Sequence, residues 1–231
     1  MARLSIYSPG ADIESLEERS AKLRVYGIEL DETFLGASRQ ELLRAHFESG
    51  LQYACIRATR PMCEYEEDEL HKLAFFCEAN GVEAIVFTDP GTSRDAAMGA
   101  LDTLSVFRVK VVLENRTGSF LSTSMDMDSF FRENRHILLC YNPAEMLLQR
   151  THPFIMELIS GTYRKNLFMI RVLERRLNGD DVLPITGDSE LLELFSAAAG
   201  FGRDVWASIA PYAGFPIEDI HAIICKGLLR V

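Results

Sequence analysis

Short apolar runs alternate along the chain with longer stretches in which apolar residues recur at helical spacing. The short runs predict buried strands, and the longer stretches predict amphipathic helices. At the start of the chain, residues 4–7 predict a strand, Asp12 is placed to cap a helix that runs to about residue 24, and residues 25–30 predict the next strand. The chain therefore opens with a strand–helix–strand unit.

The same alternation continues to the end of the chain. Further strands are expected at residues 51–58, 82–88, 109–114, 136–141, 166–173 and 204–210. Further helices are expected at residues 38–49, 66–80, 93–105 and 128–133, from residue 143 with an interruption near Pro153, and at residues 189–199 and 217–229. The polar, glycine-bearing stretch 178–188 predicts a long loop. The pattern as a whole predicts eight strands and eight helices.

Continuously apolar strands that alternate with amphipathic helices require a parallel sheet covered by helices. Eight such units without an intervening linker favour the α/β class, and within it a closed (β/α)8 TIM barrel over an open doubly wound sheet. No GxGxxG turn follows the first strand and no GxxxxGK[ST] sequence occurs, which counts against the nucleotide-binding open sheets. We therefore expect a single domain over residues 1–231.

The composition is that of a globular protein, with 48% hydrophobic and 25% charged residues among 231. A formal net charge of −10, without a cluster of Lys and Arg, argues against a nucleic acid partner. The apolar runs are too short to cross a membrane and the N-terminus turns polar too early for a secretory signal, so we expect a cytoplasmic protein without a membrane partner. Five scattered cysteines without a CxxC pair argue against a disulfide framework or a zinc knuckle.

Polar and charged residues stand at or just after the ends of the predicted strands. In a barrel, the C-terminal ends of all strands meet at one mouth, where the active sites of this fold lie. The residues expected there are Ser8, Glu29, Arg57, Asp89, Glu114, Arg116, Asn142, Arg171, Glu174 and Tyr212. Carboxylates and guanidinium groups together suit a polyol, a carboxylate or a phosphorylated sugar, because arginine pairs bidentately with anions. The alternative is a set of compensating ion pairs above a filled barrel.

Five segments of the chain resemble the xylose isomerase-like barrels, the sugar phosphate isomerase/epimerase group that also includes relatives of the apurinic endonucleases. The segments are LRVYGIELDE, VVLENRTG, LLCYNPAEML, RKNLFMIRVLE and VLPITGDSELLELFSAAAGF. The first four are similar to the second, fifth, sixth and seventh strands of that family, and the last is similar to the loop and helix after the seventh strand. The resemblance covers nearly the whole chain and implies the same barrel fold.

The resemblance also implies one divalent ion, Mn²⁺, Mg²⁺ or Zn²⁺, held by Glu, Asp, His and Glu from the fifth to eighth strands. Glu114 matches the first ligand, and Asn142 stands at the place of the Asp and keeps an oxygen donor. Arg171 stands near the place of the His, where a guanidinium cannot ligate a cation, and Ala210 stands at the place of the last Glu. Among the histidines, only His152 lies where a break in its helix would bring it to the mouth. These departures indicate that the metal has been lost, and we expect an ion pair between Glu114 and Arg171 in its place.

The resemblance implies a sugar or sugar phosphate isomerase or epimerase that moves a proton between adjacent carbons. In this hypothesis Glu114 and Glu29 are the acid and the base. The residues expected to bind the substrate are Arg57, Asp89, Arg116, Asn142, Arg171 and Tyr212. A second hypothesis is a barrel that has lost the reaction and serves as a carbohydrate-binding, anion-binding or interaction protein. A third, a metal-dependent endonuclease, needs clustered metal ligands and a basic surface, which the sequence lacks. We therefore expect a small polar or anionic partner.

Overall fold

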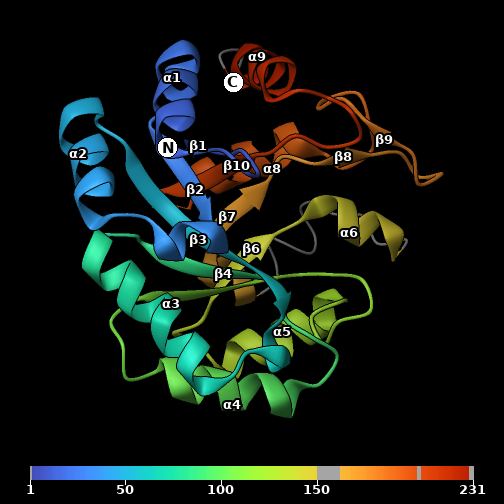
Figure 1. The fold of residues 1–231 in the computed structure, drawn as a ribbon. Helices are drawn as coiled ribbons and strands as arrows, with labels where there is room; N and C mark the ends of the chain where they lie inside the picture. The colour runs from blue at the N-terminus through green and yellow to red at the C-terminus, as the bar shows by residue number, and fades with distance from the viewer. Residues whose placement is uncertain (1, 150–161, 202–203, 229–231) are drawn as a thin grey trace.

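The computed structural model contains a closed barrel of parallel strands surrounded by helices (Figure 1). It describes residues 2–149, 162–201 and 204–228. The strands follow the order β1-β10-β7-β6-β5-β4-β3-β2 around the barrel, so that the last strand of the chain pairs with the first. Their bounds are β1 (Ala2–Tyr7), β2 (Gly27–Asp31), β3 (Gln52–Pro61), β4 (Ala84–Asp89), β5 (Lys110–Glu114), β6 (Leu138–Tyr141), β7 (Leu167–Arg171) and β10 (Val205–Ile209). The predicted (β/α)8 barrel is confirmed.

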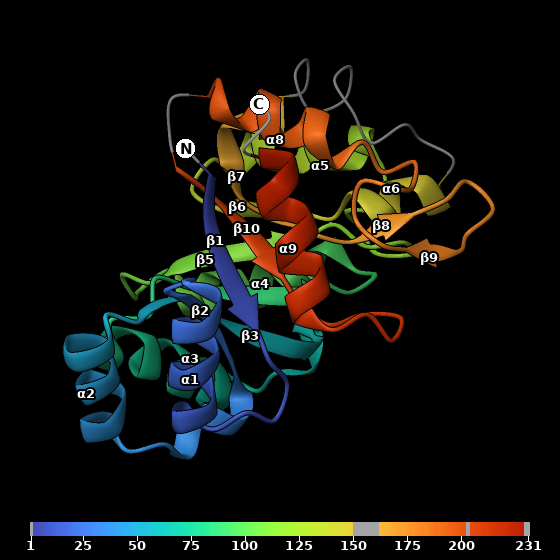
Figure 2. The same ribbon diagram turned by 90° about the horizontal axis from the view of Figure 1, so that it is seen from above.

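Helices cover the outside of the barrel on the described part of the chain (Figure 2). They are α1 (Ile13–Leu23), α2 (Arg39–Ser49), α3 (Glu67–Asn80), α4 (Arg94–Leu104), α5 (Ser124–Glu133), α6 (Pro143–Leu148), α8 (Leu191–Ala199) and α9 (Ile217–Leu228), with short 3₁₀ helices η1 (Glu32–Gly36), η2 (Met62–Glu64) and η3 (Thr162–Asn166). Ion pairs from Arg19 and Lys22 to Glu218 join α1 to α9. None of the helices described is long and apolar enough to cross a membrane.

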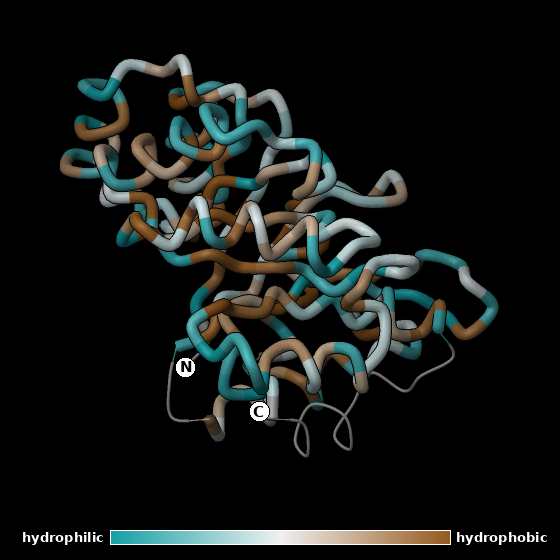
Figure 3. Tube along the Cα trace, turned by 90° about the horizontal axis from the view of Figure 1, so that it is seen from below, coloured by the Kyte–Doolittle hydropathy of each residue, from teal (hydrophilic) through white to brown (hydrophobic). Residues whose placement is uncertain are grey.

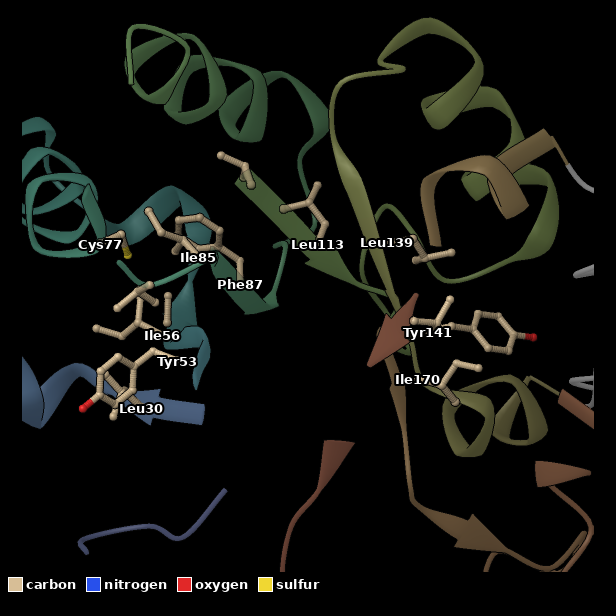
Figure 4. Close-up of a cluster of buried hydrophobic side chains, with 14 of the residues drawn as sticks. Leu30, Tyr53, Ile56, Cys77, Ile85, Phe87, Leu113, Leu139, Tyr141 and Ile170 are labelled. Atoms are coloured by element: carbon tan, nitrogen blue, oxygen red, sulfur yellow. The ribbon is translucent and has the colours of Figure 1, made fainter. Parts of the chain in front are cut away.

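Side chains that point in opposite directions along each strand divide the core into two clusters. On β4, Ile85 and Phe87 belong to the larger cluster, which packs between strands and helices, whereas Ala84 and Val86 belong to a smaller cluster inside the barrel. Figure 4 shows part of the larger cluster, with Cys77 of α3 beside Ile85. Figure 3 shows hydrophobic positions concentrated in the central strands. Both faces of the strands are therefore packed with apolar side chains.

The indole of Trp206 packs inside the barrel near the beginnings of the strands. It donates a hydrogen bond to Glu83, with 3.1 Å from Nε1 to Oε2, and the guanidinium of Arg3 lies 3.8 Å from the ring centroid. Gly27 on β2 makes this packing fit, because a Cβ at that position would overlap both the indole and the carbonyl oxygen of Leu4. Side chains therefore fill the barrel at the N-terminal ends of the strands. A functional site is expected at the other end, the C-terminal mouth.

The structure corrects three predictions about the elements. The helix predicted from residue 128 begins at Ser124, because Thr123 and Asp126 form a reciprocal capping box. The strand predicted to reach residue 173 ends at Arg171, and the chain continues into a two-stranded antiparallel sheet of β8 (Glu174–Arg175) and β9 (Asp181–Val182), part of which was predicted as loop. The predicted helix break at Pro153, and His152 beside it, lie outside the described residues.

Candidate functional site

Three charged side chains from three strands meet inside the mouth of the barrel. Glu29 lies in the middle of β2, and Glu114 and Arg171 are the last residues of β5 and β7. Each follows an outward-facing apolar residue, respectively Ile28, Leu113 and Ile170. The alternation of side chains along a strand therefore turns all three inward. The strand pattern alone thus brings two carboxylates and one guanidinium to the barrel axis.

The guanidinium of Arg171 joins the two carboxylates. Its Nε lies 2.8 Å from Oε2 of Glu114, and its Nη1 lies 2.8 Å from Oε2 of Glu29. The side chain of Glu29 is 0% exposed, that of Arg171 is 2% exposed and that of Glu114 is 9% exposed. The predicted ion pair between Glu114 and Arg171 is confirmed, and Glu29 extends it to a buried triad.

Neutral polar groups add further hydrogen bonds to the triad. Nη1 of Arg171 also donates to the Ser208 hydroxyl at 2.6 Å, and the Ser5 hydroxyl donates to Oε1 of Glu29 at 2.7 Å. The amide Nδ2 of Asn142 donates to Oε1 of Glu114 at 2.8 Å. Two atoms of the cluster, Nη2 of Arg171 and Oδ1 of Asn142, are buried without a hydrogen-bond partner among the described residues. The cluster therefore offers one donor and one acceptor to a ligand.

Asn115 fixes the position of Asn142 beside the triad. Its Oδ1 accepts a hydrogen bond from the backbone N–H of Asn142 at 2.6 Å, and its Nδ2 donates to the Asn142 carbonyl at 3.0 Å. Both asparagines are buried. This two-way contact between the ends of β5 and β6 holds the Asn142 side chain against Glu114.

Opposing effects act on the carboxyl group of Glu29. Burial alone would raise its pKa, but the positive charges of Arg171 and Arg57 and the hydroxyls of Ser208 and Ser5 outweigh burial, so the pKa of Glu29 lies below its ordinary value. The carboxylate form is therefore the stable one in the folded protein. Burial also raises the pKa of the thiols of Cys55 and Cys140 beneath the triad, so these remain neutral.

This lowered pKa predicts how stability depends on pH. Glu29 contributes stability above the pKa of the unfolded chain, about 4.3, and that contribution is lost as the pH falls through the lower folded-state pKa. We expect wild type to exceed Glu29→Gln in free energy of unfolding at pH 7, and the difference to shrink below about pH 4. Urea unfolding of both proteins at a series of pH values from neutral to acidic measures this difference in free energy of unfolding. A difference that stays constant or grows on acidification would contradict the lowered pKa.

The other residues predicted for the mouth lie outside the triad's hydrogen bonds. Asp89 and Arg116 pair with each other at 3.0 Å, and the Arg116 side chain is 51% exposed. The Tyr212 hydroxyl donates to the Val182 carbonyl of β9 at 2.6 Å. Arg57 lies 4.0 Å from Glu29, measured from Nε to Oε2. Their predicted roles in substrate binding stay predictions.

Two further residues of the predicted mouth form hydrogen bonds with neighbouring segments of the chain. The carboxylate of Glu174 accepts hydrogen bonds from the backbone N–H groups of Ser189 at 2.6 Å and Ile185 at 3.0 Å. Ser8 accepts a hydrogen bond from Arg19 of α1. The polar atoms of both residues are engaged locally, and their place in the ring at the mouth stays a prediction.

Sequence analysis missed the three small polar residues around the triad, Ser5, Ser208 and Asn115. Ser5 and Ser208 are polar residues in the middle of apolar strands, at positions that face the barrel interior. A serine within an apolar strand is visible in the sequence, but the sequence does not say which face of the strand lines the barrel. Ser208, two residues before the Ala210 that was compared with a metal ligand, is the β10 residue that touches Arg171.

The residues of the cluster do not fit a divalent cation. Such an ion needs several converging oxygen ligands, including carboxylates. Both oxygens of Glu114 are occupied, one by Asn142 and one by the cationic Arg171, which also takes Oε2 of Glu29. Among the described residues, no group of three or more His, Cys, Asp or Glu side chains could hold a metal ion. Arg171 supplies the positive charge that the resemblance assigns to a metal.

Comparison with known proteins identifies the fold. No protein-family model matches the chain, and no curated protein matches it. Among solved structures, the probable 3-DHS dehydratase AsbF of Bacillus anthracis is similar, with a TM-score of 0.77, 12% identity and 98% of each chain covered. The 3-keto-D-glucoside 4-epimerase YcjR of E. coli has a TM-score of 0.74 and 14% identity, over 99% of this chain and 100% of the epimerase.

A third similar structure is a xylose isomerase-like TIM barrel protein of Mycobacterium smegmatis in complex with magnesium. Its TM-score is 0.68 and its identity 13%, over 99% of this chain and 96% of that protein. At such identities the likeness shows the fold, and this chain has the fold of the xylose isomerase-like barrels. The resemblance seen in the sequence is confirmed at that level.

Proposed function

We propose that the mouth of the barrel binds a sugar or sugar phosphate and that the protein isomerises or epimerises it without a divalent metal. The observation that carries this proposal is the buried triad of Glu29, Arg171 and Glu114, with an unpaired donor and an unpaired acceptor in the same cluster. The structural likeness to a 3-keto-D-glucoside 4-epimerase supports a carbohydrate ligand.

A hydroxyl group of a polyol is suited to the two unpaired atoms. Each such atom costs about 1–3 kcal/mol when it stays buried without a partner. A hydroxyl accepts a hydrogen bond from Nη2 of Arg171 and donates one to Oδ1 of Asn142, so it satisfies both atoms. Both residues also bond to Glu114, which places this carboxylate next to the proposed ligand.

Isomerisation requires a base and a group that stabilises the enediolate formed next to the carbonyl. Glu114 is the more exposed of the two carboxylates and is proposed to remove the proton from one carbon. Isomerisation is complete when this proton is returned to the neighbouring carbon and the hydroxyl proton of that carbon passes to the enediolate oxygen, whereas epimerisation requires a proton to reach the opposite face of the first carbon. Arg171 keeps its charge at all relevant pH values and is proposed to stabilise the enediolate oxygen. The role of Glu29 as the second acid or base stays a prediction, since in the folded protein its carboxylate contacts Arg171.

A second candidate function is binding without turnover. One observation favours it: both carboxylates are ion-paired with the same guanidinium, and the pKa of Glu29 lies below its ordinary value, which weakens Glu29 as a base. In this case the cluster recognises the same ligand, and no proton leaves the sugar.

Proton exchange with solvent distinguishes the two functions. We expect wild type in D₂O to replace a carbon-bound hydrogen of one sugar in a panel of ketoses, aldoses and their phosphates, observed as loss of its ¹H NMR signal. Glu114→Gln should abolish this exchange, since it removes the base. Ligand binding is measured in parallel by the rise in melting temperature. Binding without exchange selects the second function, and a panel that neither binds nor exchanges would refute both.

A further inference from the structure

We infer that Arg57 recognises an acidic group, a phosphate or a carboxylate, on the ligand of the barrel mouth. This inference rests on the proposed function and narrows its substrate class from sugars in general to acidic sugars. The observation behind it is a largely buried guanidinium for which no hydrogen bond exists among the described residues.

Arg57 stands in the C-terminal half of β3, in register with Asp31 at the end of β2. Its side chain is 14% exposed, and its Nε is buried without a hydrogen-bond partner. The nearest carboxylate oxygen, Oε2 of Glu29, lies 4.0 Å from that Nε, beyond hydrogen-bond distance. Arginine carries five N–H donors, so a buried guanidinium in this state needs an acceptor from elsewhere.

The neighbouring carboxylates are committed to other partners. Oε2 of Glu29 bonds to Arg171 at 2.8 Å, and its Oε1 bonds to Ser5 at 2.7 Å. Oδ1 of Asp31 accepts from the backbone N–H of Thr33 at 2.9 Å and from the Thr33 hydroxyl. Arg57 is therefore not the main counterion of either group.

The ring of Tyr7 holds Arg57 in place. The guanidinium carbon lies 4.0 Å from the ring centroid, a cation–π contact that fixes the plane of the guanidinium without using its N–H groups. The Tyr7 hydroxyl lies 3.4 Å from Oδ2 of Asp31, which orients the ring. A fixed, planar fork of donors is the arrangement that pairs bidentately with phosphate or carboxylate.

The charges of the cluster balance once Arg57 is included. Arg171 brings one positive charge to the two carboxylates Glu29 and Glu114, and Arg57 adds a second near the same Oε2 atom of Glu29, so an incoming anion meets no net negative charge from these four groups. Arg94 of α4 differs, because it pairs directly with Glu133 and its side chain is 40% exposed. Arg94 is therefore the control for a nonspecific effect of losing an arginine.

Inorganic phosphate tests the inference directly. Melting temperatures of wild type, Arg57→Gln, Arg57→Lys and Arg94→Gln are compared in sodium phosphate and in sodium chloride of the same ionic strength. We expect phosphate to stabilise wild type and Arg94→Gln, to bind Arg57→Gln about tenfold more weakly or worse, and to bind Arg57→Lys with intermediate affinity. Acetate in place of phosphate shows whether the site also takes a carboxylate.

Two results would overturn the inference: no phosphate effect on wild type, or an equal effect on Arg57→Gln. Each sugar phosphate is also compared with its unphosphorylated sugar. If neutral sugars stabilise the protein while phosphate binding ignores Arg57, this inference fails and the proposed function stands. If no sugar of either kind binds, the proposed function fails as well.

Discussion

Replacement of Arg171 with leucine is expected to lower the free energy of unfolding at pH 7 by about 3–5 kcal/mol. The guanidinium is the shared partner of Glu29 and Glu114, whose side chains are 0% and 9% exposed. Its removal leaves the buried Glu114 without its counterion and Glu29 with only Arg57, 4.0 Å away, and poorly compensated charges are costly to bury. Urea unfolding of wild type and variant measures the loss.

The pH dependence separates lost charge compensation from lost packing. In Arg171→Leu, burial with less compensating positive charge favours the protonated form of the carboxyl groups in the folded state, so the variant should gain stability as the pH falls from neutral towards about 4–5. The surface variant Arg94→Leu, which breaks an exposed pair with Glu133, should cost at most about 1 kcal/mol. Addition of Glu29→Gln and Glu114→Gln to Arg171→Leu should restore much of the stability. If Arg171→Leu loses no more stability than Arg94→Leu, the triad is not the electrostatic centre of the mouth.

The second large effect is expected when the cluster is given metal ligands. The double variant Arg171→His/Asn142→Asp replaces the guanidinium with an imidazole and the amide with a carboxylate, next to Glu114 and Glu29. These are ligands that Mn²⁺ accepts. We expect Mn²⁺ to stabilise this variant by about 2.7 kcal/mol at a concentration 100 times its dissociation constant. Thermal denaturation with Mn²⁺ and with a chelator measures the effect.

The control for this variant is the additional change Glu114→Gln, which removes a ligand while keeping the shape of the side chain. The triple variant should lose the Mn²⁺ effect. Equal stabilisation of the double and triple variants would mean that the ion binds elsewhere on the protein. No stabilisation of the double variant would mean that the triad does not stand at a position suited to a cation.

The sequence was sufficient to predict the barrel, because its strands and helices repeat with one period and few interruptions. It also predicted which strand ends carry charge, and it predicted the pairing of Glu114 with Arg171. That pairing could be foreseen because both residues follow apolar runs at the C-terminal ends of strands. The extent of the strands was less predictable where capping groups or short hairpins set the boundary, as at Thr123 and Glu174.

The partners of each mouth residue could not be read from the sequence. Glu174 and Glu29 both follow apolar runs. Glu174 nevertheless accepts hydrogen bonds from the backbone of a following loop, whereas Glu29 pairs with Arg171. The difference depends on how a loop folds back over the strand, which no local pattern encodes. Inward-facing Ser5 and Ser208 required knowledge of which strand face lines the barrel.

The central claim is that Arg171 takes the place of a metal ion between the carboxylates of the mouth. The most direct test is a Mn²⁺ titration of the wild-type protein, followed by its melting temperature, with Glu114→Gln beside it. Mn²⁺ is expected to leave the melting temperature of wild type unchanged, because Arg171 already lies between the two carboxylates. A rise in the melting temperature of wild type that disappears in Glu114→Gln would contradict it.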